Sequence, residues 1–345
     1  MSEKITLRHV AELADVSVAT VSLALNDREG VSAQTRERVF DAAIQLGYIE
    51  EKDPEPEQIS IRLLSPYDLN GNQGISESGF YGRVLAGVEQ ECRRKNISLV
   101  YSGVEIDAYQ SLVRWSNMSI DRGIDGFLLV GSMIPPRIES ELAALGKALL
   151  LLNSYGRTSR YDAVYIDNFA GAYTAVSHLI ENGHTQIGIV GSNERHLCHQ
   201  SIFERRQGYF AALADHGIQQ SYAVDGLFNR VHVKQDTVQL LRKNPQITAI
   251  FACNDNMAVG VVEAARQLNL TIPDDLSIVG FDDDPNYSTI VTPHLTTIRV
   301  DQPLLGALGV RMLLDRITQP DQTPVYTTIT TSLIKRDSVK RLDSR

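Results

Sequence analysis

The stretch that decides the fold covers residues 5–26 and reads ITLRHVAELADVSVATVSLALN. Thr6 is a good helix N-cap, apolar residues follow it at helical spacing, and Asp-Val-Ser at 15–17 interrupts that spacing. A second short helix is predicted to start after Ser17. The side chains expected to face inward are Val10, Leu13, Ala14, Val18, Val21 and Leu25. Two short helices joined by a tight turn predict a helix-turn-helix whose second helix lies in a DNA major groove, although an ordinary helical hairpin gives the same pattern.

The residue identities favour the first interpretation. Residues 10–22 resemble the start of a regulator of the lactose repressor/galactose repressor (LacI/GalR) family, and the match continues through LN at 25–26, VS at 31–32, TRERV at 35–39 and LGY at 46–48. The match is long and ungapped, so it is more specific than a short motif. The resemblance implies an α/β protein: an N-terminal helix-turn-helix DNA-binding domain followed by a two-lobed, Rossmann-like effector domain of the type I periplasmic-binding-protein kind.

DNA contacts are predicted in and around the second helix. The set comprises Thr6, Leu7, Ser17, Val18, Ala19, Thr20, Ser22, Leu23, Asn26, Ser32, Thr35 and Arg36. Those expected near base edges are Ser17, Val18, Ala19 and Ser22. Arg36 and Arg38 are candidate phosphate ligands, although a solvated helix face explains either one equally well. The family often has an Arg where Leu23 stands; Leu23 can make only apolar contacts, so the operator should differ from the usual family site.

Charge and composition limit what the chain can be. The net charge is −9, and residues 1–50 hold five Lys or Arg against eight Asp or Glu. Because phosphate contacts supply much of the affinity for DNA, this head predicts modest binding. The three cysteines lack metal-ligand spacing and are expected to be reduced and structural. No signal peptide and no apolar run of roughly 18 residues is present, so we expect a cytoplasmic protein that does not enter a membrane.

A third helix and a linker are predicted to follow. Ser32 caps a helix that Gly47 ends, with an apolar stripe of Val39, Ala42, Ala43 and Leu46. Residues 1–49 would then be the DNA-binding domain, and residues 50–58, which are acidic and contain two prolines, a solvated linker. The family usually has a hinge helix here that inserts a leucine into the minor groove. No such segment is present, so the usual coupling through that helix is not expected.

From residue 59 onward, apolar strands alternate with amphipathic helices, which predicts parallel sheets covered on both faces. We expect strands at 59–64, 97–101, 126–131, 148–152, 163–166, 186–190, 223–226, 249–252 and 276–281, with recrossings near 295–301 and 326–333. We expect helices at 80–95, 109–122, 138–145, 169–182, 203–216, 233–243 and 257–268. Residues 59–345 would form the effector-binding and dimerisation domain, one lobe from about 59–162 and 296–325, the other from about 163–295 and 326–340.

Ligands of such folds bind at the carboxyl ends of the strands, in the crevice between the lobes. The effector-binding residues predicted there are Phe80, Tyr81, Arg205, Asn254 and Asp282. The family resemblance implies that an aromatic ring stacks on a sugar, that Arg205 grips hydroxyls or an anion, and that Asp282 accepts hydrogen bonds from vicinal hydroxyls. This set suits a sugar or a sugar-like polyol, with a purine or an acid as the alternative.

Other side chains at this edge are assigned lesser roles. Asp255 is expected to cap the helix that it opens, and Asp283 and Asp284 to shape a turn. The loop at 65–79 is a candidate extra wall of the site. The weaker effector-binding candidates are Asn153, Ser154, Asp162 and Asp167.

These features predict a ligand-responsive transcriptional repressor that is not an enzyme. No phosphate-binding loop, dinucleotide fingerprint or nucleophile elbow is present; no cofactor and no metal is expected, although His196 and His199 could be read as a metal pair. The expected partners are a pseudo-palindromic double-stranded operator DNA, a sugar-like effector and a second copy of the chain, with residues 81–95 and 304–317 as dimer contacts by resemblance. The rival interpretation is a cytoplasmic sugar-sensing protein with a vestigial DNA-binding head; a solute-binding protein of a transporter is weaker still.

Overall fold

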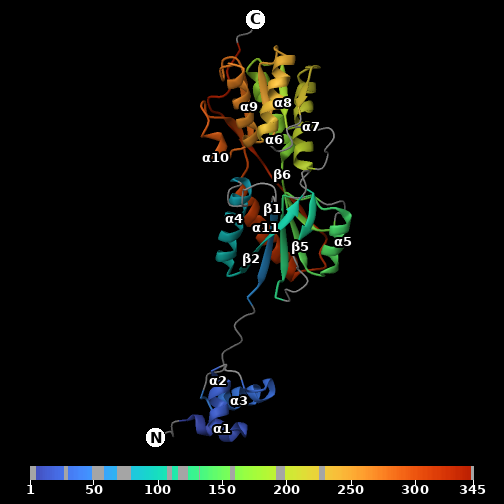
Figure 1. The fold of residues 1–345 in the computed structure, drawn as a ribbon. Helices are drawn as coiled ribbons and strands as arrows, with labels where there is room; N and C mark the ends of the chain where they lie inside the picture. Colours follow the sequence, from blue (N-terminus) through green and yellow to red (C-terminus); the bar gives the residue numbers. More distant parts are fainter. Residues whose placement is uncertain are drawn as a thin grey trace. The chain divides into compact units, whose positions relative to one another are not determined.

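The computed structural model describes residues 5–26, 30–48, 58–67, 79–106, 111–115, 123–131, 133–155, 160–191, 199–224 and 230–342. The chain divides into two compact units, residues 1–58 and 59–345, which are described separately (Figure 1). Residues 50–57 of the predicted linker and residues 68–78 of the predicted extra wall lie outside the described residues. No described helix is long and apolar enough to cross a membrane.

The described residues of the first unit form three short helices, α1 (Leu7–Ala14), α2 (Val18–Leu25) and α3 (Ala33–Gln45). Ser17 and Ser32 cap α2 and α3, because each hydroxyl oxygen accepts the backbone N–H of the residue three positions later. The helices enclose a small core of Val10, Ala11, Ala14, Val21, Ala24, Val39, Ala42 and Ala43. The predicted helix-turn-helix is therefore confirmed.

Two side chains that were predicted to face this core are exposed. Leu13 is 46% exposed and Val18 is 41% exposed. Helix α1 buries the stripe of Val10, Ala11 and Ala14, so Leu13 falls on its outer face. Val18 is the first residue of α2, whose buried positions begin only at Val21. The apolar spacing correctly identified both helices but overestimated how much of each small helix is covered.

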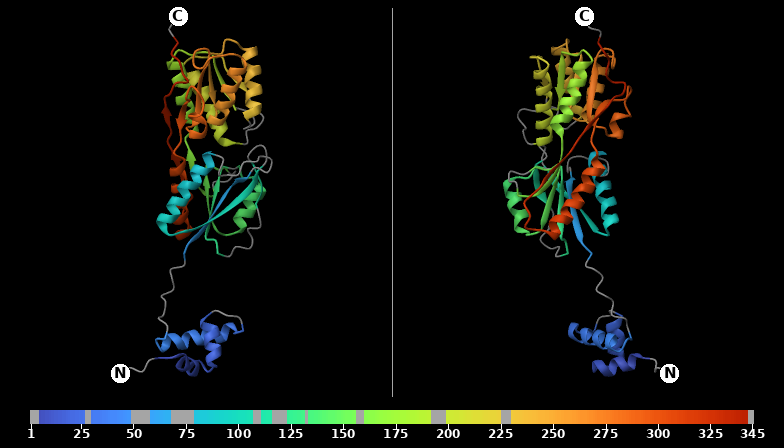
Figure 2. Two further views of the ribbon diagram at one scale, coloured as in Figure 1. Left: turned by 60° about the vertical axis from the view of Figure 1, so that its left-hand side comes forward. Right: turned by 180° about the vertical axis from the view of Figure 1, so that it is seen from behind.

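The second unit begins with a seven-stranded sheet in the order β12-β6-β5-β4-β1-β2-β3. Its strands are β1 (Ser60–Tyr67), β2 (Ser98–Ile106), β3 (Leu112–Trp115), β4 (Gly126–Val130), β5 (Ala148–Leu152), β6 (Asp162–Ile166) and β12 (Tyr326–Ile329). All pairings are parallel except β2 with β3. The helices α4 (Gly79–Lys95), α5 (Pro136–Ala144) and α11 (Gln302–Thr318) accompany this sheet (Figures 1 and 2).

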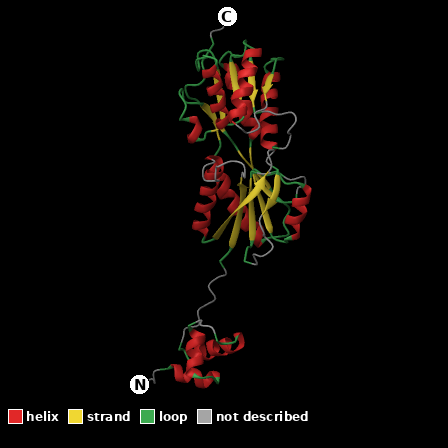
Figure 3. Cartoon of the chain, viewed as in Figure 1, coloured by secondary structure: helices red, strands yellow, loops and turns green. Residues whose placement is uncertain are grey.

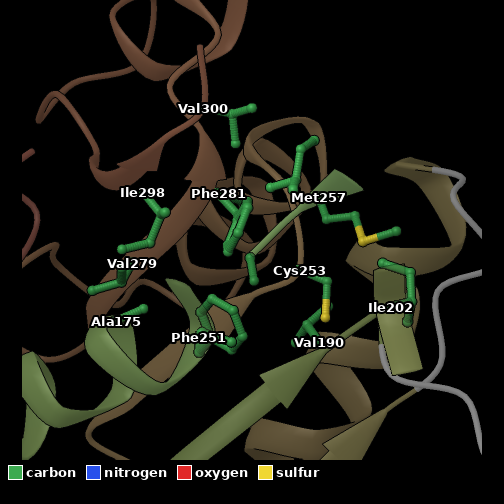
Figure 4. Packing of buried hydrophobic residues seen from close by; sticks show 14 of the residues in the cluster. Ala175, Val190, Ile202, Phe251, Cys253, Met257, Val279, Phe281, Ile298 and Val300 are labelled. Atoms are coloured by element: carbon green, nitrogen blue, oxygen red, sulfur yellow. The ribbon is translucent and has the colours of Figure 1, made fainter. Parts of the chain in front are cut away.

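The other sheet has six strands in the order β13-β11-β10-β9-β7-β8. They are β7 (Ile187–Val190), β8 (Tyr222–Val224), β9 (Ala249–Ala252), β10 (Ser277–Asp282), β11 (Thr296–Arg299) and β13 (Ser332–Ile334). Its helices are α6 (Asn168–Glu181), α7 (Gln200–Asp215), α8 (Arg230–Lys243), α9 (Asp255–Gln267) and α10 (Pro285–Ser288), which cover both faces (Figure 3). Fully buried rings of Phe251 and Phe281 lie among aliphatic side chains in its core (Figure 4). The predicted α/β class with two Rossmann-like lobes is confirmed.

The helix predicted at residues 109–122 is wrong where the structure describes it. Residues 112–115 form β3, the antiparallel edge strand beside β2. Alternation explains the difference, because Leu112 is 1% exposed whereas its neighbour Val113 is 45% exposed. The guanidinium of Arg114 also pairs with Glu105 on β2. Cross-strand contacts of this kind are invisible to a helical-periodicity argument.

The predicted lobe boundaries need correction at all three crossings. Strands β6 and β12 pair with one another in the first sheet, although both had been placed in the second lobe. Strand β11 pairs with β10 and β13 in the second sheet, although it had been placed in the first lobe. The chain therefore passes from one lobe to the other after β6, after β11 and after β12, whereas the prediction placed each passage before the strand. Sequence pattern shows that a strand exists, but only pairing shows which sheet contains it.

Helices α4 and α11 pack closely because each has a glycine where the backbone of the other helix approaches it. A Cβ on Gly87 would lie 2.0 Å from the carbonyl oxygen of Pro303, and one on Gly306 would lie 2.3 Å from that of Val84. With a larger residue at either glycine, the two helix backbones could not lie this close together. This contact fixes the start of α4, which carries Phe80 and Tyr81.

Candidate functional site

A cavity with a volume of ≈ 280 Å³ lies where the two lobes of the second unit meet. All five predicted effector-binding residues line it. Its described lining comprises Gly79, Phe80, Tyr81, Asn153, His199, Ser201, Ile202, Arg205, Asn254, Asp255, Asn256, Asp282, Asp284 and Tyr287. The carboxyl-end rule for parallel sheets thus brings together residues that are up to about two hundred positions apart in the chain.

Arg205 is the central cation of this cavity. Its side chain is 6% exposed, and its guanidinium donates to Asn168 Oδ1 (2.9 Å), to the carbonyl oxygen of Cys253, and to Asp282 Oδ1 (3.2 Å). The guanidinium carbon also lies 3.7 Å from the centre of the Phe281 ring. These contacts hold the guanidinium in one orientation, as a ligand-gripping group requires.

A glycine one turn later allows this placement. A Cβ on Gly208 would lie 2.3 Å from the carbonyl oxygen of Phe169, so only glycine lets α7 approach α6 this closely. The close approach places Arg205 beside Asn168, the first residue of α6. The spacing of Arg205 and Gly208 in the sequence thus has a packing reason.

Asp282 ends β10 and carries the main negative charge opposite Arg205. Its φ is +101°, a left-handed conformation that costs about 1–3 kcal/mol for a residue other than glycine. Its backbone oxygen accepts the side-chain N–H of Gln302 at 2.9 Å, which helps to hold this conformation. Burial raises the pKa of the Asp282 carboxyl to about 6, although Arg205 acts in the opposite direction. A strained, poorly solvated carboxylate of this kind is a candidate for ligand binding.

Asn254, not Asp255 as predicted, caps the helix α9. Asn254 is the N-cap of α9, with its Oδ1 accepting the Met257 N–H at 2.8 Å. Asp255 is 1% exposed and accepts the Asp284 N–H (2.8 Å) and the Thr297 hydroxyl (2.6 Å). Burial raises the pKa of Asp255 well above its usual range. Asp255 therefore braces the turn after β10, and the Asn254 amide N–H₂ is the group left to face the cavity.

The two aromatic residues at the start of α4, Phe80 and Tyr81, have different roles. The Phe80 and Tyr81 rings meet edge to face, with centroids 5.4 Å apart. Tyr81 donates its hydroxyl to the carbonyl oxygen of Gly131 at 3.3 Å, and burial raises the pKa of the phenol. Tyr81 is therefore tied to the end of β4, while Phe80 offers an apolar face. Tyr287 of α10 adds a third ring that was not predicted.

Several other lining residues were missed. Ser201 and Ile202 precede Arg205 by one helical turn, so helical spacing alone would have placed them on its face. Asn153, which had been given a weaker role, lines the cavity and accepts the Ser201 hydroxyl at 3.3 Å. Ser154, Asp162 and Asp167 instead serve the fold, through hydrogen bonds to Leu129, to Arg316 and to the N-terminus of α6.

The metal reading of the histidines has no support among the described residues. His199 is half-buried in the cavity lining, and desolvation together with the nearby Arg205 lowers its pKa to about 4, so its ring is neutral at physiological pH. His196 lies outside the described residues. Across the described ranges, no group of three His, Cys, Asp or Glu side chains could hold a metal ion.

The N-cap and the exposed side of α2 carry the four residues that were predicted to lie near base edges. Ser17, Val18, Ala19 and Ser22 are all exposed, as base-contacting side chains must be. The hydroxyls of Ser17 and Thr20 lie 2.8 Å apart, and the Asn26 amide donates to the Ser22 carbonyl oxygen at 2.8 Å. The residues left half-buried are Leu7, Thr20, Leu23, Thr35 and Arg36, whereas Thr6, Asn26 and Ser32 are exposed.

Arg36 has a structural contact besides its predicted phosphate contact. Its Nη1 donates to the carbonyl oxygen of Ala24 at 2.8 Å, near the end of α2. This bond joins α3 to one of the last carbonyl oxygens of α2 and so orients the two helices against one another. Arg38, in contrast, is exposed.

A helix-turn-helix unit joined to a two-lobed binding domain defines a ligand-responsive transcriptional regulator. Residues 6–51 match the profile described as bacterial regulatory proteins, lacI family, and residues 176–339 match a periplasmic binding protein-like domain. The transcriptional repressor PurR of Haemophilus influenzae is 30% identical over 342 residues, which cover 98% of this chain and 99% of that protein. The chain belongs to the LacI family of bacterial regulatory proteins.

Solved structures show the same architecture. The transcriptional regulator CelR in complex with cellobiose superimposes with a TM-score of 0.70 at 26% identity, covering 97% of this chain and 100% of that chain. The Lac repressor dimer bound to its operator and the anti-inducer ONPF superimposes with a TM-score of 0.67 at 26% identity, covering 98% and 100%. These likenesses extend over the head as well as the two-lobed domain.

Proposed function

We propose that the chain is a repressor whose affinity for an operator is set by a small hydroxylated effector bound around Arg205 and Asp282. The observation that carries this proposal is their ion pair at 3.2 Å, nearly buried, in a cavity lined by both lobes. Both groups belong to the lobe of the six-stranded sheet, and Phe80 and Asn153 line the cavity from the other lobe. A ligand that binds Arg205 and Asp282 and also packs against Phe80 therefore contacts both lobes at once. Such a ligand favours one relative position of the lobes over another, which is the requirement for regulation.

The lining suits a sugar-like ligand. Arg205 supplies N–H donors, the Asp282 carboxylate supplies acceptors, and the Asn254 amide supplies further donors to ring hydroxyls. Phe80 and Tyr287 supply aromatic faces for the apolar side of a ring. The volume of ≈ 280 Å³ is just below the ~300–1,000 Å³ common for ligand sites, which favours a monosaccharide-sized molecule. The cellobiose bound to CelR supports the sugar class. A purine or an acid would use the same donors, which makes these the competing effectors.

For DNA binding, we propose that a homodimer in the cytoplasm presents two copies of α2 to successive major grooves of a pseudo-palindromic operator. The operator-bound Lac repressor dimer supports this arrangement. Helices α4 and α11 are the proposed dimer contacts, and the exposed Leu304 on α11 is an apolar residue available to such a contact. No catalytic role is proposed for the cavity, since the matched relatives are regulators.

The effector is tested by a thermal-shift panel of monosaccharides, disaccharides, purine bases and carboxylic acids on the full chain. A hit must lose its shift in Arg205→Lys, which keeps the charge but removes the planar fork. Losing charge-assisted hydrogen bonds of about 1.5–3 kcal/mol weakens binding roughly 10- to 150-fold. The matched control is Arg206→Lys, at the next position and outside the cavity lining. Full retention of the shift in Arg205→Lys would refute the proposed site.

DNA binding is tested by selecting duplexes from a random library with the full chain, followed by gel shift. The repressor proposal expects enrichment of a site with two-fold symmetry. The rival proposal, a sugar sensor with a vestigial head, expects no enriched sequence while the thermal shift with the effector persists. The two readouts therefore separate failure of the head from failure of the effector site.

A further inference from the structure

A second cavity, which we call the β6 cavity, lies beside the crossing from β6 into α6. Its volume is ≈ 510 Å³, and it is lined by the loops after β4 and β5, by β6 and β12, and by the first turns of α6 and α7. None of the described residues that line it also lines the cavity around Arg205. The effector proposed above therefore leaves this space unexplained.

The charges of the β6 cavity are all negative among its described lining residues. Asp167 and Glu204 line it, and no Lys, Arg or His does. The Asp167 carboxylate accepts the Ala170 N–H at 2.9 Å, so it serves the positive end of the α6 dipole. Among the described residues, the cavity charge that has no cationic partner is that of Glu204.

Glu204 is held in position by neutral groups alone. Its carboxylate accepts the side-chain N–H of Gln200 and of Asn168, each at 3.1 Å. Within the described part of the chain, no cationic side chain forms an ion pair with it. A carboxylate has about four acceptor positions, so two remain for a donor from outside. Asn168 is itself fixed by Arg205, and this chain of bonds keeps the carboxylate from turning away.

Aromatic rings complete the cavity. The rings of Tyr155 and Tyr165 are stacked, with centroids 4.9 Å apart and an interplanar angle of 16°. The ring of Phe169 is 44% exposed at the same cavity. Aromatic faces attract cations through their negative quadrupole, and they also accept flat apolar groups. A half-buried carboxylate beside such rings is chemically complementary to an ammonium group that has an apolar body.

We propose that the β6 cavity is a second ligand site, for a small organic cation with a primary ammonium group and a flat or apolar body. The ammonium donates to Glu204, and the body lies against Tyr165 and Phe169. The site is separate from the effector site, and its test does not depend on the identity of the effector.

The test uses benzylamine, which is protonated at neutral pH, and benzyl alcohol, which has the same shape without the charge. Both are titrated against the full chain by saturation-transfer NMR. We expect saturable binding of benzylamine that is at least tenfold tighter than that of benzyl alcohol, a difference of about 1.4 kcal/mol. Equal affinity for the two compounds, or no saturable binding of benzylamine, would overturn the proposal.

Two variants locate the binding. Glu204→Gln keeps the side-chain shape and is expected to weaken benzylamine at least tenfold, whereas Glu141→Gln, a change on α5 outside the cavity, leaves it unchanged. Unchanged benzylamine affinity in Glu204→Gln would contradict the assignment of the site to the β6 cavity. If that variant does not fold, Phe169→Ala replaces it, because this ring is partly exposed; it is expected to weaken benzylamine at least threefold, and no effect there also contradicts the site.

Discussion

The raised pKa of Asp282 predicts that binding of the proposed effector depends on pH in a range where ordinary carboxylates do not titrate. The perturbation is a change from about pH 7 to about pH 5, during which a carboxyl with the ordinary pKa of 3.8 stays ionised. Burial raises the pKa of Asp282 to about 6, so this carboxyl gains its proton within the range. The protonated form loses its negative charge opposite Arg205 and accepts fewer hydrogen bonds from hydroxyls.

The magnitude follows from the pKa. If only the ionised form binds, the apparent dissociation constant grows by the factor 1 + 10^(pKa − pH), which is about 1.1 at pH 7 and about 11 at pH 5. Effector affinity should therefore fall about tenfold, or about 1.4 kcal/mol, as the pH falls through 6. A carboxyl of pKa 3.8 would change it by roughly 6%. His199, with a pKa of about 4, stays neutral throughout and does not contribute.

The assay is isothermal titration of the strongest hit of the thermal-shift panel at half-unit pH steps. Asp282→Asn is the control, because it should bind more weakly but with an affinity that does not change over this range. A wild-type affinity that stays constant between pH 7 and pH 5 would refute the reasoning. So would a tenfold loss that persists in Asp282→Asn, since another group would then be responsible.

Three further predictions concern stability, operator recognition and coupling. Arg316→Met removes the partner of Asp162, which is 4% exposed, and should lower the free energy of unfolding by about 3–5 kcal/mol in urea denaturation; adding Asp162→Asn should restore part of it. Ser22→Ala, on the exposed side of α2, should leave the melting temperature unchanged and weaken operator binding roughly 2- to 12-fold in a gel shift; equal operator affinity would remove Ser22 from the interface. Gln302→Met should reduce the effect of the effector on operator binding by a larger factor than it reduces effector affinity, since its amide also helps to hold Asp282. Gln319→Met, at an exposed position after the end of α11, should change neither, and an unaltered effect of the effector in Gln302→Met would contradict the proposed route.

The sequence contained most of the information needed for the fold of the second unit. Buried parallel strands are continuous apolar runs, such as 148–152, and each stands next to a helix with a clear stripe. Residues 112–115 were misassigned because an edge strand that alternates buried and exposed residues has no such run. Sheet membership of β6, β11 and β12 depends on pairing between strands far apart in the sequence, which local pattern does not contain.

The five residues predicted for the candidate site all line the cavity, but the sequence did not predict the role of each side chain there. Family resemblance and strand ends located Arg205 and Asp282, because the chain must leave each strand at the cleft. The sequence did not show whether Asn254 or Asp255 caps α9, since both residue types are good helix caps and only the burial of Asp255 decides between them. Tyr287 was missed because α10 is a single short turn with no periodic pattern.

One bond gives the effector site a direct route to the proposed dimer contact. Gln302 is fully buried at the start of α11, and its amide donates to the backbone oxygen of Asp282, whose carboxylate meets Arg205. The backbone of Asp282 is held at φ +101°, so a ligand that shifts this residue also shifts the carbonyl that Gln302 binds. Because α11 lies against α4 without a Cβ between them at Gly306, its first turn cannot move without moving α4. A rigid connection of this kind can carry the response to the dimer face whether or not a hinge helix forms.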